Sequence, residues 1–174
     1  MVMGIDPGVA NTGFGVVRIA GSTMTPLDGG VIEEPAGDHA EQRLARIHAE
    51  LEKLLDWHEP EAVALEDVYF GRNVRSAIGV GEARGVAMLA AATRRIPCFD
   101  YTPQEVKMAV CGNGAAPKEQ VQRMVASLLG LSTTPDPDHA ADALAVAICH
   151  SAHVRPARPA ATVSGVAPPR AAAG

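Results

Sequence analysis

Acidic residues that could act together end two short apolar runs of this sequence. Asp6 ends the first run and is followed by a glycine-spaced turn, in the stretch GIDPGVANTGFGVV. Glu66 ends the second run, and Asp67 follows it, in the stretch EAVALEDV. Such runs predict buried strands whose acids lie at the carboxyl edge of a sheet, where open α/β sheets bind ligands. Only one of Glu66 and Asp67 can line a given site, because neighbouring strand residues face opposite sides. Taken alone, Glu66 is interpreted more readily as a strand-end acid that meets solvent than as a site residue.

A third group of ionisable side chains opens the last predicted helix, in the stretch PDPDHAADALA. We expect Asp136 at the N-cap and Pro137 at the first helical position. His139 and Asp142 then share one helical face, as do Asp138 and Asp142, and the alanines between them permit close packing against a sheet. The helix dipole accounts for acids in the first turn. Asp142 lies deeper, in an apolar stretch that should be buried, where an acid needs a partner or a metal.

Together these residues form an oxygen-rich set of possible metal ligands: Asp6, Glu66, and His139 or Asp138 beside Asp142. Such a set suits Mg²⁺ or Mn²⁺, and an imidazole shifts the preference toward Mn²⁺. In two-metal phosphoryl chemistry the ions lie ~3.5–4 Å apart and are held by carboxylates from several elements. Other chemistries lack their motifs, because the sequence contains no GxSxG, GxxxxGK[ST], HExxH or CxxC.

Basic and aromatic residues near these acids could contact a phosphate backbone. Lys118 follows Pro117 at the start of a helix that no capping side chain precedes, so free backbone N–H groups and a lysine would meet there. Lys107 lies on the preceding short helix. The stretch after Glu66 supplies further candidate DNA contacts, with a core position as the alternative for the aromatics: Tyr69, Phe70, Arg72, Asn73 and Arg75.

The elements that must position these residues alternate between strands and helices, which predicts a mixed sheet covered by helices. A helix at 75–95 has one face of small residues, Ala77, Gly81, Gly85 and Ala92. This face favours packing inside the fold slightly over contact with a second subunit. Strands are expected at 2–6, 14–19 and 30–34, in EAVALEDV and in IPCFDY. Further helices are expected at 39–58, at 103–110, from 118, and near DPDHAADALAVAICH. A capping box formed by Thr102 and Glu105 opens the helix at 103–110.

Length and composition allow one domain. The chain has 174 residues, a formal net charge of −5 and three scattered cysteines. The charge argues against a generic nucleic-acid binder, although bound metal would neutralise a cluster of acids. We expect a cytoplasmic protein with reduced thiols, no signal peptide and no membrane span. Residues 1–154 form the predicted domain, and the Pro- and Ala-rich residues 155–174 a disordered tail.

Four stretches in this order resemble the bacterial Holliday-junction resolvase family RuvC: GIDPGVANTGFGVV, LEDVYFGRNVRSAIGVGEARGVA, DYTPQEVKMAVCGNGAAPKEQVQRMV and DHAADALAVAICH. The resemblance covers about residues 2 to 153. It implies a ribonuclease-H-like five-stranded mixed sheet, with an antiparallel hairpin unit and parallel strands, flanked by helices. It also implies a homodimer that resolves four-way DNA junctions in recombinational repair by symmetric, two-metal-ion nicking of opposed strands. The products would carry 5′-phosphate and 3′-hydroxyl ends.

The resemblance also assigns roles to residues. The catalytic acids of the family fall on Asp6, Glu66, His139 and Asp142, although many members have Asp where this sequence has His139. Asp138 is therefore kept as a possible substitute ligand. The phosphate-contacting lysines match Lys107 and Lys118, with Lys118 counted among the catalytic residues, and the base-stacking aromatic falls in the Tyr69–Phe70 pair. The implied partners are junction DNA and the RuvA and RuvB branch-migration proteins.

Two other classes of protein could use parts of this pattern. Actin-like and sugar-kinase-like ATPases begin with a similar Asp–x–Gly hairpin that cradles phosphates, but they need a second related domain, which 174 residues cannot supply. A non-catalytic junction-binding protein should lack some of the acids, whereas a plausible ligand stands at each of the four positions.

Overall fold

A five-stranded mixed sheet forms the centre of the protein. The computed structural model describes residues 1–8, 10–33, 37, 39–67 and 74–153. The strand order is β3-β2-β1-β4-β5, with antiparallel pairing of β1 with β2 and of β2 with β3, and parallel pairing of β1 with β4 and of β4 with β5. This is the predicted hairpin unit joined to parallel strands. The strand bounds are β1 Val2–Asp6, β2 Asn11–Ala20, β3 Thr23–Glu33, β4 Ala62–Glu66 and β5 Cys98–Tyr101.

The strands of the hairpin are longer than the sequence analysis predicted. β2 and β3 pair along their whole length, from the Asn11–Glu33 pair to the Ala20–Thr23 pair. The predicted strands at 14–19 and 30–34 were too short, and residue 34 lies outside the described residues. Gly and Pro in this stretch indicated a loop, but Pro26 is tolerated because β3 is an edge strand and the register shifts between Val16 and Val17.

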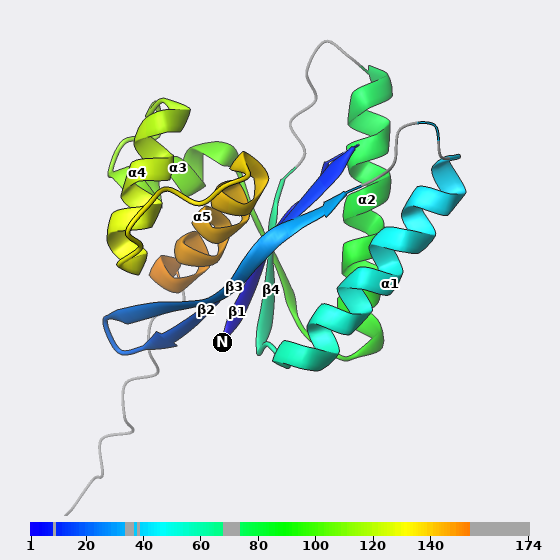
Figure 1. Ribbon diagram of the computed structural model, residues 1–174, viewed down its shortest axis with the longest axis horizontal. Coiled ribbons are helices and arrows are strands. Elements are labelled where there is room, and N and C mark those ends of the chain that lie inside the picture. The colour runs from blue at the N-terminus through cyan, green and yellow to red at the C-terminus, as the bar shows by residue number, and fades with distance from the viewer. Residues whose placement is uncertain (9, 34–36, 38, 68–73, 154–174) are drawn as a thin grey trace, which may run out of the picture.

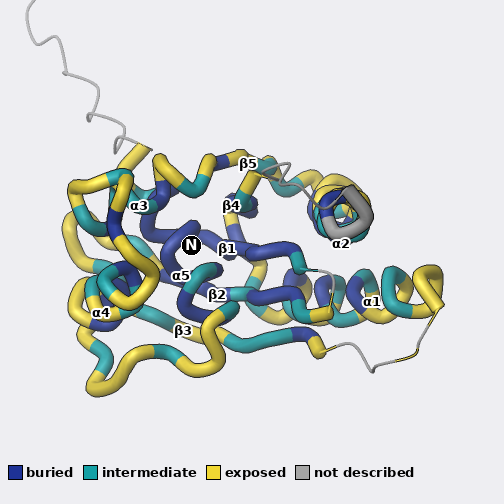
Figure 2. The backbone as a smooth tube through the Cα atoms, turned by 90° about the horizontal axis from the view of Figure 1, so that it is seen from above, coloured by how far each residue is buried: buried dark blue, intermediate teal, exposed yellow. Residues whose placement is uncertain are grey.

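Helices cover both faces of the sheet (Figure 1). On one face lie α1 (Ala40–His58) and α2 (Val74–Thr93), and on the other lie α3 (Pro103–Cys111), α4 (Lys118–Leu129) and α5 (Asp138–His153). Alternate strand residues enter the two cores, so Met3 and Ile5 pack toward α1 and α2 while Val2 packs toward α5. Figure 2 shows α5 as the most enclosed of the helices, lying directly on the sheet.

Glycines in the sheet allow α5 to approach it closely. A Cβ added at Gly4 would overlap the carbonyl oxygen of Ala143, and one added at Gly13 would overlap that of His139. A Cβ at Gly15 would lie 2.7 Å from the Leu144 side chain. The alanine-rich face of α5 therefore meets bare backbone, and this contact brings the acids of α5 next to the end of β1.

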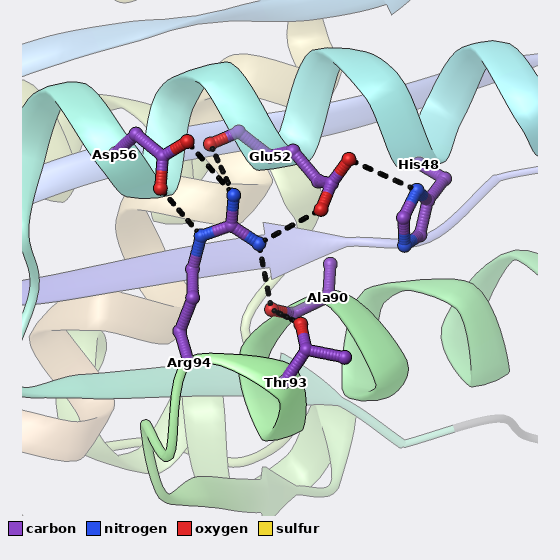
Figure 3. Close-up of polar contacts among 6 residues, drawn as sticks. All are labelled: His48, Glu52, Asp56, Ala90, Thr93 and Arg94. Atoms are coloured by element: carbon purple, nitrogen blue, oxygen red, sulfur yellow. Dashed lines mark hydrogen bonds and ion pairs between the residues drawn. The ribbon is translucent and has the colours of Figure 1, made fainter.

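The pair formed by α1 and α2 is joined at one end by a single guanidinium group (Figure 3). Arg94 donates from Nε and Nη2 to the two carboxylate oxygens of Asp56, at 2.6 and 2.8 Å, and from Nη1 to Glu52 at 3.0 Å. This bidentate geometry fixes the end of α2 against α1.

The outer face of α2 does not pack inside the described part of the fold. A Cβ at Gly81 or Gly85 would meet nothing within 4 Å. Ile78 and Leu89 lie on the same face and are 57% and 55% exposed. Packing inside the fold was the favoured interpretation of this small-residue face, and it is wrong for both glycines; only Ala77 of the set is buried.

The helix boundaries follow the capping signals closely. Thr102 and Glu105 form the predicted capping box at the start of α3, and α4 begins after Pro117 without a side-chain cap. α5 begins at Asp138, one residue later than the predicted first helical position at Pro137. Within the described residues, no helix has the length and apolar character needed to span a bilayer.

Candidate active site

Adjacent parallel strands bring the first two acids together. Ile5 of β1 pairs with Leu65 of β4, so Asp6 and Glu66 stand side by side where these strands end. Ile5 and Leu65 point into the core on the α1 side, and alternation directs both acids toward α5. The first turn of α5 lies at this same end of the sheet (Figure 1).

Asp6, His139 and Asp142 form a compact cluster. One ligand atom from each lies within 4.8 Å of the others. His139 Nδ1 and Asp6 Oδ2 are 2.9 Å apart in a hydrogen bond that orients the imidazole ring. Asp6 is buried, whereas Asp142 and His139 are partly open to solvent. The predicted helical spacing therefore does place His139 and Asp142 on one face, against the end of β1.

Glu66 lies beside this cluster rather than within it. The pKa of Glu66 is raised from 4.5 to about 8. Burial is the largest cause, the nearby charges of Asp6 and Asp142 add to it, and the charge of Lys107 opposes it only weakly. A hydrogen bond with Asp6 acts in the same direction. Burial also raises the pKa of Asp142, against the lowering effect of Lys118. Without a metal ion, these carboxyl groups therefore hold protons more tightly than free acids.

Lys118 and Lys107 lie on the helical side of the site. A cavity of about 190 Å³ is lined by both lysines together with Glu66 and Asp142. The Lys118 ammonium is 3.0 Å from Asp142 Oδ2 and 3.3 Å from Asp138 Oδ2. Burial lowers the pKa of Lys118, but the hydrogen bonds and charges of Asp142 and Asp138 outweigh it and leave that pKa above its usual value. The predicted basic groups thus meet the predicted acids.

One contact of this site was not foreseen. Gln122 Nε2 donates a 2.8 Å hydrogen bond to Asp138 Oδ1, and this bond and Lys118 hold the pKa of Asp138 below its usual value. The sequence does carry a signal, because Gln122 follows Lys118 by one helical turn and shares its face. Asp138 lies outside the cluster of Asp6, His139 and Asp142. Its carboxylate instead contacts Lys118 and Gln122.

The remaining candidate DNA contacts follow Glu66 in the sequence. Tyr69, Phe70, Arg72 and Asn73 lie outside the described residues. Arg75 lies in the first turn of α2, and its side chain is not among those described.

The donor set fits a divalent cation. Hard carboxylate oxygens and one imidazole converge from β1, β4 and α5. The pKa values of Glu66 and Asp142 are raised by burial and, to a smaller extent, by the negative charges of their neighbours. A cation of charge +2 would relieve that repulsion, and Lys118 supplies only part of the compensation. Nitrogen and oxygen donors of this kind match Mg²⁺ or Mn²⁺.

Known proteins with similar sequences and structures identify the family. The family model described as crossover junction endodeoxyribonuclease RuvC matches residues 2–150. RuvC of Moorella thermoacetica is 49% identical over 151 residues, which cover 87% of this chain and 90% of the relative. RuvC of Rubrobacter xylanophilus is 48% identical over 171 residues, covering 98% and 93%.

A solved structure agrees with these sequence matches. The structure described as Thermus thermophilus RuvC in complex with Holliday junction substrate superposes with a TM-score of 0.82 at 41% identity, covering 86% of this chain and 92% of that one. The yeast mitochondrial Holliday junction resolvase, at 13% identity and a TM-score of 0.60, shares the ribonuclease-H-like fold. This chain belongs to the RuvC family of crossover junction endodeoxyribonucleases.

Proposed function

We propose that this chain resolves Holliday junctions by nicking opposed strands of a four-way DNA junction symmetrically, as a homodimer, during recombinational repair. The observation that carries the proposal is the convergence of Asp6, Glu66, His139 and Asp142 beside a small cavity lined by Lys107 and Lys118. Acids that can hold metal next to lysines that can hold phosphate are the parts that phosphodiester hydrolysis requires. A relative of 41% identity has been solved with junction DNA.

The acids of the cluster would hold two Mg²⁺ or Mn²⁺ ions. Asp6 would be shared, because it adjoins both Glu66 and the α5 pair. Such ions, when bound, activate a water molecule and stabilise the leaving oxygen. In the reaction the water oxygen bonds to phosphorus, the P–O3′ bond breaks and the 3′ oxygen takes a proton, which leaves 5′-phosphate and 3′-hydroxyl ends.

The lysines would hold the scissile phosphate. Lys107 and Lys118 both line the 190 Å³ cavity, and an ammonium can neutralise a non-bridging phosphate oxygen as charge develops there. The hydrogen bond from His139 Nδ1 to the Asp6 carboxylate would keep the imidazole ring oriented toward the same space.

The outer face of α2 would form the dimer contact. Small residues at Gly81 and Gly85 let a second helix approach closely, and the exposed side chains of Ile78 and Leu89 offer apolar area to bury. A two-fold dimer would supply one active site for each of the two strands to be cut. We extend the proposal to cooperation with the RuvA and RuvB branch-migration proteins, which the family resemblance implies. Residues 1–154 would form the nuclease domain and 155–174 an appended tail.

Cleavage of a labelled synthetic four-way junction tests the proposal. We expect the wild type to nick opposed strands with Mg²⁺ or Mn²⁺ and to leave linear duplex uncut. Asp6→Asn should bind the junction without cutting it, while Glu50→Gln, which changes a partly exposed acid on α1, should cut normally. Binding without cleavage by the wild type would indicate a degenerate junction-binding protein. ATP hydrolysis, with neither junction binding nor cleavage, would indicate that Asp6 helps to hold nucleotide phosphates instead.

A further inference from the structure

The Lys118 ammonium is shared between two carboxylates that differ in their surroundings. Asp142 belongs to the cluster that can hold metal and its side chain is 27% exposed. Asp138 lies outside that cluster and its side chain is 64% exposed. Lys118 is 3.0 Å from the first carboxylate and 3.3 Å from the second. An inner and an outer acceptor therefore compete for one ammonium.

Metal binding would create a conflict at the inner acceptor. A divalent cation on Asp142 needs the same carboxylate charge that Lys118 contacts, and it repels the ammonium. If Asp142 were the sole acceptor, Lys118 would lose its only ion pair when the cation bound. That loss would weaken metal binding, and the ammonium would be free to leave the site.

We propose that Asp138, oriented by Gln122, is a positioning residue that keeps Lys118 at the rim of the active site when a divalent cation occupies Asp142. This inference rests on the proposed metal site. The Gln122 amide fixes one oxygen of Asp138 at 2.8 Å, and the other oxygen remains on Lys118. Asp138 thus acts through the lysine and is not itself a metal ligand.

The packing of α4 against α5 explains why these four residues meet. Lys118 and Gln122 are one turn apart on α4, and Asp138 and Asp142 are one turn apart on α5. The lysine end of α4 can reach both acids, while the glutamine reaches only the outer one. Moving from the inner to the outer acid therefore shifts the ammonium by a short distance, and Lys118 still lines the cavity with Lys107.

The reaction gains from this arrangement in two ways. The cation binds Asp142 while the Lys118 ammonium keeps Asp138 as a carboxylate partner. The lysine also stays within reach of a phosphate oxygen in the cavity. Asp138 should consequently affect metal binding only when Lys118 is present. A directly ligating or purely electrostatic Asp138 would affect it with or without the lysine.

A double-mutant cycle on Mn²⁺ binding separates these cases. Free Mn²⁺ is measured by electron paramagnetic resonance with the full chain and no DNA, for wild type, Asp138→Asn, Lys118→Met and the double variant. We expect Asp138→Asn to weaken Mn²⁺ binding about two- to fivefold, the range of a partly exposed ion pair. In the Lys118→Met background the same change should alter Mn²⁺ binding less than about 1.5-fold, because Asp138 acts on the metal site only through Lys118. The cycle isolates this pairwise coupling. Gln122→Ala should weaken it to a smaller extent, and only with Lys118 present.

Three results would overturn the proposal. Equal weakening in both backgrounds would make Asp138 a ligand or a source of through-space charge. Unchanged Mn²⁺ affinity in Asp138→Asn would remove its role altogether. Asp142→Asn serves as the reference, and unchanged Mn²⁺ binding in this variant would contradict the metal site itself, a failure distinct from the other two. Circular dichroism and thermal melting of each variant confirm that the chain remains folded.

Discussion

Replacing Glu66 by Gln should change how the stability of the metal-free protein depends on pH. Burial, with the charges of Asp6 and Asp142, raises the pKa of Glu66 from 4.5 to about 8. The folded protein therefore holds a proton on Glu66 over a range where the unfolded chain has released it. Stability falls with rising pH wherever the folded state binds more protons, so it should fall between about pH 4.5 and 8. Glu66→Gln removes this dependence because an amide does not titrate.

The size of the effect follows from the shift. Each pKa unit corresponds to about 1.4 kcal/mol, so the full shift of Glu66 would amount to roughly 4–5 kcal/mol above pH 8. Asp142, whose pKa is also raised by burial, lies in the same crowded space and can take up part of the proton binding when Glu66 is changed. We therefore expect Glu66→Gln to be about 2 kcal/mol more stable than the wild type at pH 9, and within ~0.5 kcal/mol of it at pH 4.

Urea unfolding in EDTA from pH 4 to 9 measures these differences. Glu50→Gln is the matched control, because it makes the same chemical change at a partly exposed position on α1, beside Lys53. It should unfold like the wild type at every pH. Saturating Mn²⁺ should reverse the order at pH 8, since a bound cation favours the ionised Glu66 of the wild type and Gln offers no charge.

Parallel stability curves for wild type and Glu66→Gln between pH 5 and 8 would refute this reasoning. They would mean that Glu66 ionises freely in the folded protein, so the acids at the ends of β1 and β4 would not be crowded. The claim that the site is built to receive a cation would then lose its electrostatic basis.

Three further changes test the fold and the assembly. Gly4→Ala should destabilise the protein by more than about 3 kcal/mol in thermal or urea denaturation, because the added Cβ would overlap the Ala143 carbonyl oxygen of α5. Thr102→Ala should cost about 1 kcal/mol in the same assay through loss of the capping box of α3, whereas Thr102→Ser should retain most of it. If the proposed dimer forms through α2, Leu89→Glu should sediment as a monomer in analytical ultracentrifugation, while Trp57→Glu, at an 82% exposed position on α1, should sediment as a dimer like the wild type.

Local rules predicted most of the geometry of the site from the sequence. A run of strand length ending in an acid placed Asp6 and Glu66 at one sheet edge, and the two-residue period of a strand directs both toward α5. Helical spacing placed His139 and Asp142 on one face. Each of these inferences needs only the side-chain repeat of a strand or helix and the direction of the chain. Both can be read from a single segment of the sequence.

Contacts between segments were harder to predict. The acceptors of Lys118 depend on how α4 packs on α5, so the sequence indicated an anion site where the structure shows two carboxylates. The full length of β2 and β3 was missed because Pro26 indicates a loop unless the strand is known to be at an edge. The exposure of Gly81 and Gly85 likewise depends on which face of α2 packs against α1, and helical spacing within α2 does not reveal this.

Anomalous diffraction from a crystal soaked in Mn²⁺ tests the central claim most directly. We predict manganese peaks at the end of β1, with Asp6 in contact with each ion and with Asp142 and Glu66 each in contact with one. In Asp6→Asn crystals the peaks should disappear. Manganese that binds elsewhere, or a wild-type crystal with no peak beside Asp6, would contradict the account.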